Sequence, residues 1–172
     1  MLSLHTLRST IRSSRRLGHL HITSPSLRRQ HTTMSSPLPH TPLNHFLREA
    51  RTDFLANAAH SSAPLRVVMG NEAGDLDSLV CAIAFSYLSY HRDSKAQRWY
   101  PLVQTERQDF KLRAENQLAL KTCLIDEDHI ISLDDWTRTV QSEEAPEIAL
   151  VDHCKLAARW KPDLTVKAVI DQ

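Results

Sequence analysis

The stretch Val67-Val68-Met69-Gly70-Asn71-Glu72-Ala73-Gly74-Asp75-Leu76-Asp77-Ser78 decides the fold that we expect for this chain of 172 residues. Its first three residues are apolar and mostly β-branched, which favours a buried strand. Gly70 and Gly74 bracket a tight turn, where glycine most easily allows a positive φ or a close approach of the backbone. From Leu76 to Tyr90 the sequence is largely apolar and free of Gly and Pro, which predicts a buried helix. Asp75 and Asp77 therefore lie between a strand and a helix, where open α/β sheets bind ligands.

The rest of the chain repeats this alternation of apolar strands and helical segments. Further strands are predicted at 99–103, 148–151 and 166–170, and further helices at 44–59 and 110–124. Asn44 is the predicted cap of the first of these helices. Strands that alternate with helices predict an α/β fold with a mostly parallel sheet.

The N-terminal segment has a composition of its own. Six of the 21 basic residues, all arginines, precede residue 44, whereas all 20 acidic residues follow it. Residues 1–33 combine arginines with one apolar face, as mitochondrial transit peptides do, and we expect this segment to be disordered. A disordered tail without an address and a basic binding arm are the alternatives. Residues 34–43 contain three prolines and are predicted to be a linker, and a start at Met34 would give a cytoplasmic form.

Cysteine use and apolar runs exclude several classes of protein. The three cysteines are far apart and form no CxxC pair, so neither a disulfide framework nor a zinc ribbon is indicated. No apolar run reaches the roughly 18 residues that a membrane span needs, and we expect no membrane partner. Because the chain after residue 43 is net acidic, we also expect no nucleic-acid partner.

Acidic residues follow several of the predicted strands. Asp75 and Asp77 follow the first strand, Asp152 follows 148–151 and Asp171 follows 166–170. Parallel strands present their carboxyl ends on one side of a sheet, so these carboxylates can converge, and hard oxygen ligands suit Mg²⁺ or Mn²⁺. The alternative for Asp75 and Asp77 is a purely structural cap of the following helix. His153, directly after Asp152, favours the metal site, whereas Asp134 and Asp135 are predicted to be surface caps.

Four short motifs together resemble the DHH phosphoesterases, in the branch of the fungal exopolyphosphatases and prune-like proteins. The first motif is Gly70-Asn71-Glu72-Ala73-Gly74-Asp75-Leu76-Asp77-Ser78 and the second is Leu150-Val151-Asp152-His153. Glu106 to Arg113 resembles the segment between them, and Val169-Ile170-Asp171 resembles the approach to the third motif. The resemblance covers residues 44–171.

The resemblance implies a Rossmann-like domain that binds two divalent ions, Mn²⁺ or else Mg²⁺ or Co²⁺. By position, Asn71, Asp75, Asp77 and Asp152 would be the metal ligands, with Asp152 bridging both ions. Asp77, Asp152 and His153 would be the catalytic residues, with His153 beside the ligands rather than among them. Arg107 would contact the phosphates of the substrate.

The implied activity is that of an exopolyphosphatase-type phosphohydrolase, which cleaves inorganic polyphosphate or pyrophosphate by metal-activated water. The third motif requires two histidines after Asp171, but Gln172 follows and the sequence ends. Residues 44–172 are therefore expected to be a partial DHH domain that lacks the C-terminal substrate-clamping domain (DHHA2-like). The alternatives are a truncated fragment without turnover, which acts as a binding module, and a prune-like cyclic-nucleotide phosphodiesterase.

Overall fold

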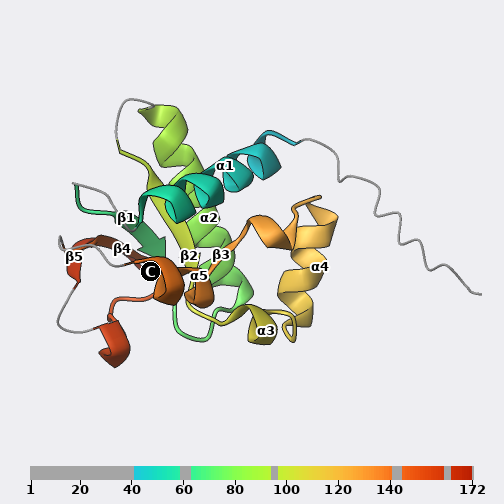
Figure 1. Cartoon of the computed structure of the whole chain (residues 1–172). Helices are drawn as coiled ribbons and strands as arrows, with labels where there is room; N and C mark the ends of the chain where they lie inside the picture. The colour runs from blue at the N-terminus through green and yellow to red at the C-terminus, as the bar shows by residue number, and fades with distance from the viewer. Residues whose placement is uncertain (1–40, 59–62, 94–96, 141–144, 161–163, 172) are drawn as a thin grey trace, which may run out of the picture. The chain divides into compact units, whose positions relative to one another are not determined.

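Five parallel strands form a single sheet in the order β3-β2-β1-β4-β5 (Figure 1). The strands are β1 (Arg66–Met69), β2 (Trp99–Val103), β3 (Ile131–Ser132), β4 (Glu147–Val151) and β5 (Thr165–Ile170). The predicted α/β class is thus confirmed, and every strand pair that the structure describes is parallel. The strand of the opening stretch, β1, lies at the centre of the sheet between β2 and β4.

The computed structural model describes residues 41–58, 63–93, 97–140, 145–160 and 164–171. The predicted transit peptide at 1–33 and most of the predicted linker lie outside these ranges. Within them, no helix has the length and the apolar character that crossing a bilayer requires.

The helices follow the predicted order with some different boundaries. The helical elements are α1 (Pro42–Asn57), α2 (Leu76–Arg92), α3 (Arg107–Phe110), α4 (Ala114–Thr122), α5 (Leu133–Thr139) and the 3-10 turns η1 (Glu127–His129) and η2 (Ala158–Trp160). The single helix predicted at 110–124 is wrong, because the chain breaks between α3 and α4 and continues as two short helices.

The first helix, α1, starts earlier than predicted. Its N-cap is Thr41, whose hydroxyl accepts a hydrogen bond from the backbone N–H of Asn44 at 3.1 Å. Pro42 occupies the first turn, where its missing N–H costs nothing. Asn44 is therefore a buried helix residue rather than the cap, and its side-chain oxygen accepts from the Asp126 backbone and contacts Nδ1 of His129 at 2.8 Å.

Side chains of the central strands alternate between two apolar clusters. Val68 packs with Ala82 of α2 and with Ala149 of β4. Val67 and Met69 belong to the larger cluster, which α1 enters through Phe54. Both faces of β1 are therefore buried, as expected for a central strand of a parallel sheet, and the loop that leaves its carboxyl end starts from a rigid support.

The edge strand β5 differs from the buried strand that the sequence predicts. Val169 is 49% exposed and Ile170 is 51% exposed, although their neighbours in β4 are buried. The register between β4 and β5 shifts between Ile148 and Ala149, so that Lys167 has no partner in the ladder and pairs with Glu147 at 3.4 Å. The apolar composition of β5 predicted a strand correctly, but its place at the edge leaves it exposed.

Candidate functional site

The loop between β1 and α2 is closed by two side chains of its own. The backbone N–H of Gly74, which has a φ of 58°, donates to Oδ1 of Asn71 at 3.0 Å. Asp75 is the N-cap of α2, and its Oδ1 accepts from the backbone N–H of Ser78 at 3.1 Å. The capping alternative for Asp75 is therefore real, but it uses one carboxylate oxygen and leaves Oδ2 for other contacts.

The carboxyl ends of β1 and β4 bring acids from distant parts of the sequence together. The side-chain amide of Asn71 donates to Oδ2 of Asp75 at 2.8 Å and lies 3.4 Å from Oδ2 of Asp152. Asp152 follows β4 directly and has a φ of 60°, a strained conformation for a residue other than glycine. Its backbone N–H donates to Ile170 of β5 at 3.0 Å, so the carboxyl end of β5 and the following Asp171 are close by. The predicted convergence of Asp75 and Asp152 is present in the structure.

Ser78 connects this loop to β4, a role that the sequence analysis missed. Its hydroxyl donates to Oδ2 of Asp152 at 2.8 Å and accepts from the backbone N–H of Asn71 at 2.8 Å. Ser78 is buried in the first turn of α2, and a Cβ added to Gly70 would lie 2.2 Å from the Ser78 Cβ. Only glycine at position 70 therefore leaves room for this contact. The sequence offered Asp75 as a possible helix cap but gave no sign of the bond from Ser78 to Asp152.

Negative charge gathers around the start of α2. The hydrogen bond from Asn71 is the main reason that the pKa of Asp75 is lower than usual; burial opposes this effect, while Ser78 and the charge of Arg113 add to it. Burial raises the pKa of the Cys81 thiol, and the charges of Asp152, Asp77 and Asp75 raise it further. Asp77 lies four residues before Cys81 on α2, so the two side chains are neighbours on one face of the helix.

Carboxylate and amide oxygens such as those at this site are suitable ligands for a hard divalent cation. In the structure, the side chains of Asn71, Asp75 and Asp152 contact one another. The amide N–H₂ of Asn71 lies between two carboxylates, which is where a positive charge would be stabilised. To act as a ligand, Asn71 would have to present its oxygen, which here accepts from Gly74. Within the described ranges, no group of three or more His, Cys, Asp and Glu side chains is arranged to hold a metal ion. The carboxylates of Asp75 and Asp152 fit a divalent ion by chemistry and by convergence, and the metal assignment stays a prediction.

His153 lies next to this cluster but does not contact its carboxylates. Its Nδ1 is 2.9 Å from the carbonyl oxygen of Val151, and its Nε2 is buried without a hydrogen-bond partner among the described residues. The contact with Val151 restrains the ring in one orientation. A catalytic role of His153 stays a prediction.

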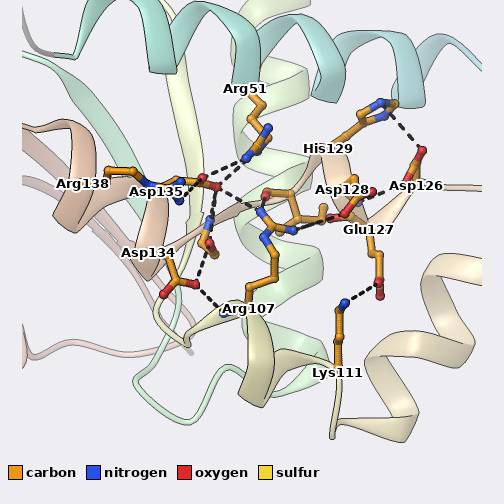
Figure 2. Close-up of polar contacts among 12 residues, drawn as sticks. Arg51, Arg107, Lys111, Asp126, Glu127, Asp128, His129, Asp134, Asp135 and Arg138 are labelled. Carbon is orange, nitrogen blue, oxygen red and sulfur yellow. Dashed lines mark hydrogen bonds and ion pairs between the residues drawn. The ribbon is translucent and has the colours of Figure 1, made fainter.

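Arg107 lies in a different network, around Asp135 (Figure 2). Its Nη2 donates to Oδ2 of Asp135 at 3.0 Å and to the carbonyl of Ile130 at 2.9 Å, and its Nη1 donates to the carbonyl of Glu127 at 3.2 Å. The described contacts of this guanidinium are thus all within the network, and none is with the acids at β1 and β4. The phosphate contact predicted for Arg107 finds no support in these contacts.

The prediction that Asp135 is a surface cap is wrong. Asp135 does cap α5 through a capping box with Ser132, but it is fully buried. Arg51 of α1 donates to both of its oxygens, at 2.9 and 3.2 Å, and Arg138 lies at 3.4 Å. Burial alone would raise the pKa of Asp135, but the hydrogen bonds from Arg51 and Ser132 and the charges of Arg51 and Arg107 lower it below its usual value.

The geometry defines a class of α/β protein with an acidic site at the carboxyl ends of neighbouring parallel strands, the general position of ligand sites in such sheets. No family model matches the chain. The chain is similar to exopolyphosphatase PRUNE1 of Rattus norvegicus and of Mus musculus, with 35% identity over 97 residues in each case. The same protein of Bos taurus is 33% identical over 97 residues.

These matches cover 56% of this chain but only 21% of each relative. The chain therefore spans about a fifth of the length of the curated relatives that it matches. The similarity points to the prune-like proteins of the DHH phosphoesterases, and within the chain it concerns somewhat more than half of the residues.

Proposed function

We propose that this chain carries part of the active site of a metal-dependent phosphohydrolase of the exopolyphosphatase type, which cleaves the phosphoanhydride bonds of inorganic polyphosphate or pyrophosphate. The similarity to exopolyphosphatase PRUNE1 supports a phosphorylated substrate. The single observation that carries the proposal is the convergence of Asp75 and Asp152 on one amide group at the carboxyl ends of β1 and β4.

In the proposed site, Asp75, Asp77 and Asp152 would hold Mn²⁺, or Mg²⁺ or Co²⁺, and Asn71 would add a neutral oxygen. Bound divalent ions would make water a stronger acid, so that hydroxide would be available as the nucleophile toward phosphorus at neutral pH. Ser78 keeps the carboxylate of Asp152 in place through its hydroxyl. The left-handed backbone of Asp152 turns the chain away from β4 at this point. His153, restrained by its contact with Val151, would support Asp152 from the next position in the chain.

Phosphate release tests this function directly. We expect the 172-residue protein with Mn²⁺ to release phosphate from polyphosphate or pyrophosphate, and we expect Asp77→Ala and Asp152→Ala to abolish the release. Asp128→Asn is the matched control, because Asp128 is an exposed acid of η1 outside the cluster. Activity that survives in both alanine variants would contradict the metal assignment. Binding of Mn²⁺ without phosphate release would instead favour a binding module.

The N-terminal composition supports a further proposal about location. We propose that residues 1–33 direct the chain to the mitochondrial matrix and that a start at Met34 would give a cytoplasmic form. N-terminal sequencing of the native protein tests both points. A mature protein that still begins at Met1 would contradict cleavage of a transit peptide.

A further inference from the structure

Arg113, the last residue of the segment Glu106 to Arg113, lies next to the acidic site. It is the N-cap of α4, and three residues later Asn116 donates its side-chain amide to the carbonyl of Gly74 at 2.8 Å. Asn116 is completely buried, so this contact fixes the start of α4 against the loop that carries Asp75. Arg113 is thereby held beside that loop.

The guanidinium of Arg113 differs from that of Arg107 in its contacts. Arg107 is paired with Asp135 and with two backbone carbonyls. Nε of Arg113 is buried, and no described residue accepts a hydrogen bond from it. Nor does Arg113 form an ion pair within the part of the chain that the structure describes, although its charge lowers the pKa of Asp75. A buried donor without a partner is costly, and a guanidinium is well suited to a phosphate oxygen.

A second donor without a partner lies against the same loop. Thr105 follows the carboxyl end of β2 and is only 8% exposed. Its hydroxyl has no hydrogen-bond partner among the described residues, and its Oγ1 lies 3.4 Å from the point where a Cβ on Gly74 would be. Two hydrogen-bond donors, one of them cationic, thus border the loop of Asp75, one just after β2 and one just before α4.

We propose that Arg113 is the residue of this chain that binds a phosphoryl group of the substrate beside Asp75. The inference rests on the proposed phosphohydrolase function and deepens it by naming the cation that neutralises the substrate. Metal ions are attracted to negative charge and phosphate to positive charge. Loss of the Arg113 charge should therefore affect the binding of phosphate and of metal ions differently. Removing its charge weakens phosphate binding, whereas it leaves metal binding unchanged or makes it tighter.

The test measures two affinities of the 172-residue protein by calorimetry, first for Mn²⁺ alone and then for imidodiphosphate, a pyrophosphate analogue that resists hydrolysis, in the presence of Mn²⁺. We expect Arg113→Gln to weaken imidodiphosphate binding by roughly tenfold to a hundredfold, the range of a lost hydrogen bond to a charged group. The affinity for Mn²⁺ should stay within about twofold or increase. Arg113→Lys should recover part of the lost affinity, because it restores the charge but not the planar fork of donors.

Arg138→Gln is the control, because Arg138 is an exposed arginine on α5 and should leave both affinities unchanged. Unchanged imidodiphosphate binding in Arg113→Gln would overturn the inference while leaving the proposed function intact. A parallel loss of both affinities would show that Arg113 only supports the loop, and this too would overturn it. If the unaltered protein bound Mn²⁺ but no imidodiphosphate, the proposed function would fail and the inference with it.

Discussion

Two groups of carboxylates in this fold are treated in opposite ways. Asp135 is completely buried, and Arg51, Arg107 and Arg138 all lie within 3.4 Å of it. Asp75 and Asp152 are only partly buried and are linked by two neutral side chains, Asn71 and Ser78. The difference separates an acid whose charge is compensated by arginines from acids that neutral side chains hold together, as the proposed cation site would require.

The comparison also explains why burial alone does not identify a functional acid. A buried carboxylate that pairs with arginines holds structural elements together, and removing it leaves the arginine charges without a partner. Carboxylates that repel one another at the carboxyl ends of strands lower the stability of the fold. Such clusters are typical of functional sites, where a ligand compensates the charge. The predictions that follow test each side of this contrast, from the largest effect on stability to the smallest.

Asp135→Ala should be the most destabilising of these changes. It leaves the guanidinium groups of Arg51 and Arg107 without their carboxylate, and breaking a buried ion pair in this way costs about 3–5 kcal/mol. Urea unfolding of the variant and the unaltered protein measures the difference. Arg138→Gln, which removes the exposed partner, should cost less than about 1 kcal/mol. If Asp135→Ala lowered the unfolding free energy by less than about 1 kcal/mol, the network around Asp135 would contribute little to stability.

Acid should remove the contribution of Asp135 selectively. Its pKa is lower in the folded state than in the unfolded chain, so its stabilising effect is fully present above the unfolded value of about 4 and is lost as the pH falls through the folded value. The difference in unfolding free energy between the unaltered protein and Asp135→Asn should therefore be constant near neutral pH and shrink below about pH 4. A difference that stays constant down to pH 2 would contradict the lowered pKa.

Ser78→Ala should produce an intermediate loss. The change removes the donor to Asp152 and leaves the backbone N–H of Asn71 without its acceptor, which costs about 1–3 kcal/mol for a buried group. Thr137→Ala is the control, because the Thr137 hydroxyl donates to the carbonyl of Leu133 one turn earlier, on an exposed face of α5. Equal unfolding free energies of the two variants would show that the contacts of Ser78 do not stabilise the fold.

The central elements could be predicted from the sequence because their signals are local. Val67 to Met69 and Ile148 to Val151 are continuous apolar runs. Helix α2 coincides with a largely apolar stretch that contains no Gly or Pro. The convergence of Asp75 and Asp152 follows from a general property of parallel sheets, so it was predictable before the strand order was known.

The remaining features depend on contacts between distant residues. Asp135 appeared to be a surface cap because the arginine that neutralises it, Arg51, is 84 residues away in the chain. The break between α3 and α4 gave no Gly or Pro signal. The links made by Ser78 and the position of Arg113 likewise arise from tertiary packing, which neither periodicity nor spacing records.

Asp77→Asn should have the smallest effect on stability and so completes the contrast with Asp135. Asp77 is an exposed residue of the first turn of α2, and no described residue forms a hydrogen bond or ion pair with its carboxylate. Losing its favourable interaction with the helix dipole is offset by relief from the nearby Asp75 and Asp152, so the unfolding free energy should change by less than about 0.5 kcal/mol. Its affinity for Mn²⁺, measured by calorimetry on the same sample, should nevertheless fall at least about tenfold, because a charged ligand becomes neutral. Asp135→Asn should show the reverse pattern, with a large loss of stability and an unchanged affinity in the folded protein. If Asp77→Asn instead lost stability and kept its affinity for Mn²⁺, Asp77 would have a structural role at the start of α2, as the N-cap Asp75 has. The distinction between the two groups of carboxylates would then not hold for Asp77.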